Sequence, residues 1–140
     1  MICIISGTSQ FTATGRVTIP GTGNIRFPNV QVNDGGDYNA STGVFTCRIP
    51  GQYWISSTLT KVYNDNVDEV YCLVIINGSS KLEMTTDPVS DETAGYSMSA
   101  SAGFHLRLGD RVQVGECGNP DHIYNTIDPF FSGILIKPDV

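Results

Sequence analysis

The chain has 140 residues, of which 40% are hydrophobic and 16% are charged, and its formal net charge at pH 7 is -6. This composition predicts one globular domain with a sizeable core and excludes a disordered chain. The acidic balance argues against unaided binding to nucleic acid or to anionic membranes, which requires clustered Lys and Arg, and no apolar run is long enough to span a membrane.

Short apolar segments separated by turn residues predict β-structure along the whole chain, and no segment has a helical period of note. We predict strands, in chain order, over residues 10–19, 25–32, 44–49, 52–63, 69–77, 81–86, 95–108, 111–117 and 129–137. Pro28 interrupts the second of these and predicts an edge strand or a bulge. Asn77-Gly78 is a strong signal for a two-residue hairpin turn.

Two strands show how the faces are used. In residues 95–108 seven apolar side chains alternate with a second face of Ser, Gly, His and Arg. The strand after Pro50 has Tyr53 and Ile55 on one face and Trp54 on the other. We therefore expect one face in the core and the other partly against a neighbouring subunit. Together the elements predict an all-β sandwich or barrel.

Six residues at fixed spacing carry a resemblance to a known family. They are Phe27, Asn33, Tyr38, Phe45, Gly51 and Tyr53. Residues 108–112 and 131–139 match the family's turn before its seventh strand and its last strand. The chain resembles the globular head domain of the complement C1q family, a relative of tumour necrosis factor, from about residue 9 to residue 139. Ile55 and Ser57 replace two further aromatic residues of the pattern, as in a diverged member.

The resemblance implies a ten-stranded jelly-roll sandwich over residues 9–140, preceded by a tail of residues 1–8. It also implies a secreted homotrimer, with the final strand and the strand after Pro50 near the threefold axis. The tail is apolar but lacks the basic flank of a signal peptide, so we interpret it as the end of a longer precursor or an artificial start. The collagen stalk that often precedes such domains is absent from this sequence, which has no Gly-X-Y repeat.

The cysteines and two glycosylation sequons give further expectations. Cys47 and Cys72 lie on apolar strand faces, where a small buried thiol is favoured. Cys117 and Cys3 lie at a strand end and in the tail, and either can pair within the chain or between chains. Asn39 and Asn77 begin Asn-X-Ser triplets in turns, each a modest indication of secretion.

The sequence favours a metal site over catalysis. We expect no catalytic residue, because His105 lies on a polar strand face, His122 lies in a loop, and no serine occupies an elbow motif. Asp87, Asp91 and Glu92 place carboxylates in one loop, which suits calcium. The resemblance implies a calcium site in this loop, and an ordinary solvated acidic loop is an equally good interpretation.

Ligand recognition is expected on loops that a rigid sandwich carries. His122, Tyr124 and Asn125 offer a ring and hydrogen-bonding groups suited to carbohydrate. By resemblance, we expect an innate-immune, lectin-like module that binds microbial surface glycans or lipopolysaccharide, aided by calcium if the acidic loop holds it. The alternatives are a trimeric cytokine- or hormone-like ligand for a protein receptor and a purely structural trimer.

Overall fold

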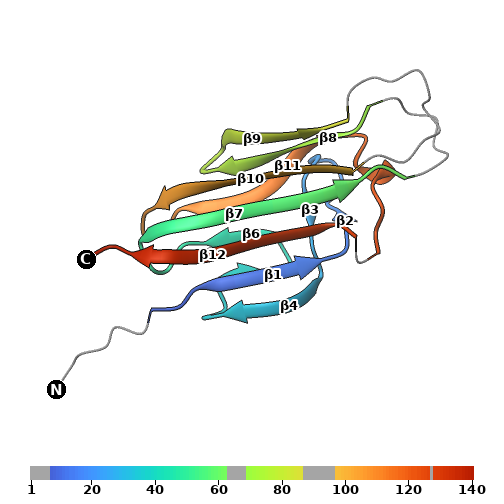
Figure 1. Ribbon diagram of the computed structural model, residues 1–140. Helices are drawn as coiled ribbons and strands as arrows, with labels where there is room; N and C mark the ends of the chain where they lie inside the picture. Colours follow the sequence, from blue (N-terminus) through green and yellow to red (C-terminus); the bar gives the residue numbers. More distant parts are fainter. Residues whose placement is uncertain (1–6, 63–68, 87–96, 127) are drawn as a thin grey trace.

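The computed structural model describes residues 7–62, 69–86, 97–126 and 128–140. In these residues the chain forms two five-stranded antiparallel sheets packed face to face, with a two-stranded ribbon beside them (Figure 1). The strands are β1 (Gln10–Thr14), β2 (Val17–Thr18), β3 (Ile25–Arg26), β4 (Asn29–Asp34), β5 (Tyr38–Asn39), β6 (Val44–Thr46), β7 (Gly51–Thr60), β8 (Tyr71–Ile76), β9 (Ser79–Thr85), β10 (Ser97–Leu106), β11 (Arg111–Gly118) and β12 (Phe130–Pro138). The predicted ten-stranded jelly-roll sandwich is confirmed.

The first sheet has the strand order β10-β7-β12-β1-β4, and the second has the order β5-β6-β11-β8-β9. In the first sheet β7 lies between β10 and β12, so that Trp54 pairs with Gly103 on one side and Ile134 on the other. The face of this sheet that points away from the sandwich is called the outer face below. The pairing places residues from three distant parts of the chain side by side on that face.

The core between the sheets is built around aromatic rings. Phe11 stacks on Tyr38 at a centroid distance of 4.9 Å and on Phe45 at 5.0 Å, and Phe131 meets Phe11 edge-on at 4.8 Å. All four side chains are at most 3% exposed. Stacked and edge-on ring pairs of this kind add to the stabilisation from buried apolar area. The alternation of β1 explains the place of the central ring, because it turns Phe11 and Ala13 to the same buried face.

The boundaries differ from prediction where a single residue redirects the backbone. The strand predicted over residues 10–19 ends at Thr14, because Gly15 has a φ of 83° and the chain then leaves the first sheet to form β2. The edge predicted at Pro28 is confirmed, since β4 is the outermost strand of its sheet and its pairing with β1 shifts register between Thr12 and Ala13. The hairpin at Asn77-Gly78 is also confirmed, with φ values of 51° and 79°.

The carboxyl-terminal residues are fastened across the first sheet. The Asp139 amide donates to the Pro50 carbonyl at 2.9 Å, and the Asp139 carboxylate lies 2.8 Å from His105 Nε2. Position 51 requires glycine, because a Cβ on Gly51 would overlap the backbone at the end of β12. The chain terminus therefore lies at the end of the sandwich where β7 begins and β10 finishes (Figure 1).

Candidate functional site

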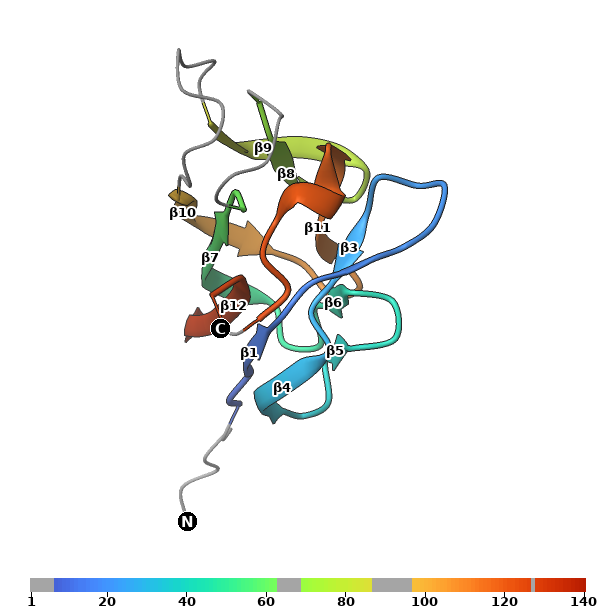
Figure 2. The same ribbon diagram turned by 90° about the vertical axis from the view of Figure 1, so that its right-hand side faces the viewer.

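A short 3-10 helix, η1 (Pro120–His122), lies across the end of the sandwich opposite the carboxyl terminus (Figures 1 and 2). Its last residue and those that follow it extend the pairing of β7. The Val62 amide donates to the His122 carbonyl at 2.8 Å, and the Tyr124 amide donates to the Thr60 carbonyl at 3.0 Å. Between them, Ile123 is fully buried in the core. This loop is therefore an extension of the sheet and not a loose connection.

Two polar side chains hold η1 from its flanks. Arg16 donates from Nε and Nη2 to the Ile123 carbonyl at 3.1 and 2.8 Å, and its Nη1 lies 3.7 Å from Asp121. The Asn119 side-chain amide donates to the Glu69 carbonyl at 2.8 Å, with Asn119 itself in the left-handed region at a φ of 56°. Sequence reasoning missed both anchors, because the first joins residues 107 positions apart and the second joins residues 50 positions apart.

The predicted ligand residues lie together on this anchored segment. His122 and Tyr124 are half-buried on either side of Ile123, which is extended and points into the core, and Asn125 is exposed. An imidazole, a phenol and an amide on one fixed segment can donate to and accept from the hydroxyls of a polyol. The arrangement is a candidate recognition surface.

The predicted metal ligands Asp87, Asp91 and Glu92 lie outside the described residues. Among the residues that the structure does describe, no group of three or more His, Cys, Asp or Glu side chains is placed to hold a metal ion. The calcium site thus stays a prediction from sequence. In the same described ranges, no helix has the length and apolar character that crossing a membrane requires.

The outer face of the first sheet is divided into two halves. Near the carboxyl-terminal end, Trp54, Ile134 and Ile136 are 45%, 40% and 62% exposed. Toward η1 the same face carries hydroxyls that bond across β7 and β10, with Thr58 to Ser99 at 2.9 Å and Thr60 to Ser97 at 3.1 Å. The predicted alternation in residues 95–108 is confirmed within β10, where Met98 and Leu106 are buried and the intervening serines are exposed. The outer face thus carries an exposed apolar cluster beside a ladder of hydroxyl groups.

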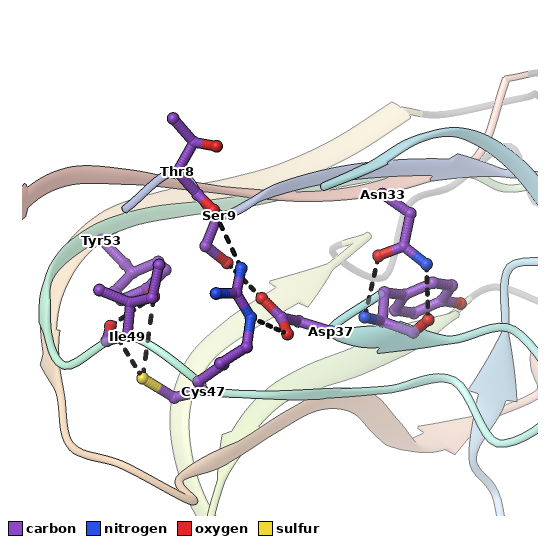
Figure 3. A network of polar contacts seen from close by, with 9 residues as sticks. Thr8, Ser9, Asn33, Asp37, Cys47, Ile49 and Tyr53 are labelled. Carbon is purple, nitrogen blue, oxygen red and sulfur yellow. Dashed lines mark hydrogen bonds and ion pairs between the residues drawn. The ribbon is translucent and has the colours of Figure 1, made fainter. Parts of the chain in front are cut away.

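A polar network joins the start of the domain to residues that flank β5 and β6 (Figure 3). The Asp37 carboxylate accepts from Ser9 Oγ at 2.8 Å and from Arg48 Nε at 2.9 Å, and Arg48 Nη2 donates to the Thr8 carbonyl at 3.0 Å. The bond from Asp37 raises the pKa of Arg48, which therefore stays charged. The network fixes where the chain enters the sandwich.

Beside this network, the Tyr53 hydroxyl donates to the Ile49 carbonyl at 2.6 Å, and the Cys47 thiol lies 3.8 Å from that hydroxyl. Burial raises the pKa of Cys47 and raises the pKa of Tyr53 to about 12. A buried thiol held neutral is a poor nucleophile and a poor metal ligand. The prediction of a buried structural thiol at Cys47 is confirmed.

Cys72 is buried as predicted, but it is not a free thiol, because it forms a disulfide with Cys117. The two residues lie on the paired strands β8 and β11, where the register shifts between Gly115 and Gly118. This irregularity follows from Glu116, whose φ is 51°, and it cannot be read from the apolar pattern of β8. Cys3, the other predicted partner, lies outside the described residues.

The two sequons occupy different environments. Asn39 is exposed, and its Oδ1 accepts from the Ser41 amide at 2.8 Å. Asn77 is also exposed, but its Nδ2 donates to Asp110 at 2.9 Å and its Oδ1 accepts from the Arg111 amide at 2.9 Å. The side-chain amide of Asn77 is therefore part of the turn structure.

Comparison with known proteins gives consistent matches. The family model described as C1q domain matches residues 10–136. A complement C1q subcomponent of Rattus norvegicus is 30% identical over 125 residues, which cover 84% of this chain and 45% of that protein. Complement C1q tumor necrosis factor-related protein 5 of Homo sapiens is 31% identical over 144 residues, covering 98% of this chain and 57% of that protein. The chain thus spans about half the length of these relatives.

Solved structures agree on the fold. The globular domain of zebrafish complement 1qA superimposes with a TM-score of 0.71 at 19% identity, covering 94% of this chain and 99% of that one. Murine APRIL at pH 8.0 superimposes with a TM-score of 0.67 at 13% identity, covering 93% and 100%. At these identities the likeness concerns the fold alone.

Proposed function

Because this chain belongs to the C1q domain family, we propose that it is a secreted, homotrimeric recognition module that binds microbial surface glycans or lipopolysaccharide. Trimer formation is supported by the apolar half of the outer face, where Trp54, Ile134 and Ile136 are all exposed. Contiguous apolar side chains of this size are costly to leave in water and mark an interface. Secretion is supported by the disulfide, which persists in oxidising compartments.

Ligand binding is assigned to residues 122–125, which are the last residue of η1 and the three that follow it. His122, Tyr124 and Asn125 project from a backbone held by β7 and Arg16, so little conformational entropy is lost when a sugar binds. A single shallow contact of this kind gives weak affinity. Three copies on one trimer compensate, since binding at the second and third site is effectively intramolecular on a repeating glycan.

Calcium at Asp87, Asp91 and Glu92 is a further part of this proposal and is supported by the sequence alone. Hard oxygen ligands from one acidic loop suit calcium, and the bound ion would offset part of the net charge of -6. A calcium-dependent rise in melting temperature that is lost in Asp87→Ala tests it. An equal rise in wild type and variant would remove Asp87 from the site.

The oligomeric state is tested by light scattering. We expect a mass three times the 15.1 kDa of one chain at micromolar concentration. Trp54→Glu should shift the mass toward one chain, because it buries a charge in an apolar contact. Leu108→Glu is the matched control, since Leu108 is 72% exposed in the turn between β10 and β11, the strands of two different sheets. A monomeric wild type would contradict the proposal.

The ligand is tested on an array of glycans and microbial polysaccharides, with calcium and again after chelation. Asn125→Ala should weaken specific binding at least about tenfold, whereas Gln31→Ala, an exposed change on the edge strand β4, should not. Specific binding that chelation abolishes supports both the lectin and the metal. No binding to any glycan would favour the alternative, a trimeric cytokine- or hormone-like ligand of a protein receptor, which pull-down of partners then addresses.

A further inference from the structure

A shallow polar depression lies at the end of the second sheet that carries the β8–β9 turn, far from η1. It has a volume of about 250 Å³ and is lined by Asn77, Gly78, Arg111 and Gln113. Arg111 and Gln113 alternate along β11 on the side opposite the buried Val112 and Val114. The depression therefore opens to solvent on the surface of the second sheet and is separate from the outer face of the first.

The wall of this depression is fixed before any ligand arrives. Asn77 and Gly78 both have positive φ, which closes the hairpin in two residues. The Asn77 side chain then bonds to Asp110 Oδ1 and to the Arg111 amide, both at 2.9 Å, while the Asn77 backbone amide donates to the Arg111 carbonyl at 2.9 Å. Three hydrogen bonds thus join the β8–β9 turn to the start of β11, and a preformed site loses little entropy on binding.

The guanidinium group of Arg111 is available to bind an anion. The nearest carboxylate, Asp110, has both oxygens engaged, Oδ1 by Asn77 and Oδ2 by the Arg107 amide at 2.8 Å. These donors hold the pKa of Asp110 below its usual value, with the Arg107 bond the larger cause. Elsewhere, Arg16 and Arg48 bond acceptors of the chain through their guanidinium groups. Within the described residues, no acceptor of the chain bonds the guanidinium of Arg111, which is exposed at the depression.

From this geometry we propose that the depression binds the acidic group of a sugar, with the Arg111 guanidinium and the Gln113 amide as its principal contacts. The planar fork of Arg matches a carboxylate, sulfate or phosphate with two parallel hydrogen bonds. Gln113 can donate to the same group or bond a neighbouring hydroxyl. The volume is below the roughly 300–1,000 Å³ of pockets for drug-sized ligands, so the depression has room for about one substituted ring.

This inference rests on the proposed function only in taking the ligand to be a sugar. Recognition of an anion follows from Arg111 itself. It also requires Asn77 to be unglycosylated, because a glycan there would cover the depression. The test therefore uses the full chain secreted into a bacterial periplasm, where the Cys72–Cys117 disulfide forms and N-glycans are not added.

The experiment is a titration followed by the backbone amide of Gly78 and the side-chain amide of Gln113 in nitrogen–proton NMR spectra. The probes are galacturonate, galactose 6-sulfate, galactose 6-phosphate, neutral galactose and inorganic sulfate, at constant ionic strength. We expect saturable shifts with at least one acidic sugar and none with galactose. Arg111→Gln should weaken binding at least about tenfold. Lys137→Gln, which removes an equal charge at the other sheet, should change it less than about twofold.

The outcomes separate the possibilities. A preference among the three acidic sugars identifies the acidic group. Equal binding of galactose, or unchanged affinity in Arg111→Gln, would overturn the proposal, and inorganic sulfate binding as tightly as every sugar would overturn its sugar part. If Arg111→Gln abolishes these shifts while array binding persists, the site stands apart from that at η1. If wild type binds no glycan on the array yet gives the shifts, the proposed function fails and this inference holds.

Discussion

Replacing Tyr38 with Phe should destabilise the domain although it removes only one oxygen atom. The Tyr38 hydroxyl accepts from the Phe27 amide and donates to the Phe27 carbonyl, each at 3.0 Å, and both residues are at most 3% exposed. In Tyr38→Phe both backbone groups lose their partner where water does not reach. At about 1–2 kcal/mol for each such group, the free energy of unfolding should fall by about 2–4 kcal/mol.

The measurement is urea unfolding at fixed protein concentration, so that any association contributes equally to all variants. With a slope of about 2 kcal/mol per molar urea, the midpoint should fall by about 1–2 M. The ring stack with Phe11, at 4.9 Å and 2° between planes, stays in place, so the slope should not change. Tyr71→Phe is the control, because Tyr71 is 37% exposed, and it should cost less than about 0.5 kcal/mol. Equal midpoints for the two variants would refute the reasoning.

Alkaline pH gives the same hydroxyl a second readout. Burial raises the pKa of Tyr38 to about 12 from its ordinary value of 10.0, so the folded state keeps the proton longer than the unfolded state. Stability from this group is therefore complete below about pH 10 and is lost as pH rises toward about 12. Since burial also raises the pKa of Tyr53 to about 12, Tyr38→Phe should reduce the alkaline loss without abolishing it. An unchanged pH dependence would contradict the assignment.

Two further changes test the second sheet. Removing the disulfide by Cys72→Ala together with Cys117→Ala should lower the free energy of unfolding by about 4 kcal/mol, because it frees a loop of 45 residues in the unfolded chain. Calorimetry of the oxidised wild type and of the double variant measures the difference. Asn77→Ala should cost about 1–2 kcal/mol and should also flatten the acid side of the stability curve. Hydrogen bonds lower the pKa of Asp110, the larger effect coming from the Arg107 amide and the smaller from the Asn77 side chain. The Asp110 carboxylate therefore stabilises the fold above its unfolded pKa, and this stabilisation is lost as pH falls through the folded pKa. An identical acid limb in the variant would exclude Asn77 as a cause.

The strands were predictable where local pattern and burial agree. Period-2 alternation placed Tyr53 and Ile55 inward and Trp54 outward, and the structure has them so, because the pairing of β7 is regular on both sides at these three residues. Alternation could not find the break at Gly15, since the apolar phase continues through it while the backbone turns away. A single positive φ leaves no trace in hydropathy.

In the candidate sites, groupings of sequence neighbours were predictable and contacts between distant residues were not. His122, Tyr124 and Asn125 are neighbours in sequence, so their proximity needed no knowledge of the fold. Arg16, which bonds the carbonyl of Ile123, lies 107 positions away, and no local pattern joins the two. The pairing of Cys72 was missed for a similar reason, because burial of a half-cystine and of a free thiol give the same apolar environment.

The fastening of Asp139 at Pro50 has a practical consequence for any assay on a solid support. Asp139 and the entry of the chain at Ser9 lie at one pole of the sandwich, and η1 lies at the other (Figure 1). A protein tethered through either terminus therefore presents η1 to the solution and turns the β8–β9 turn toward the support. Arg111 would be shielded in that orientation. An array printed with tethered protein therefore measures binding at η1 alone, and only the untethered chain exposes both η1 and Arg111 to a ligand.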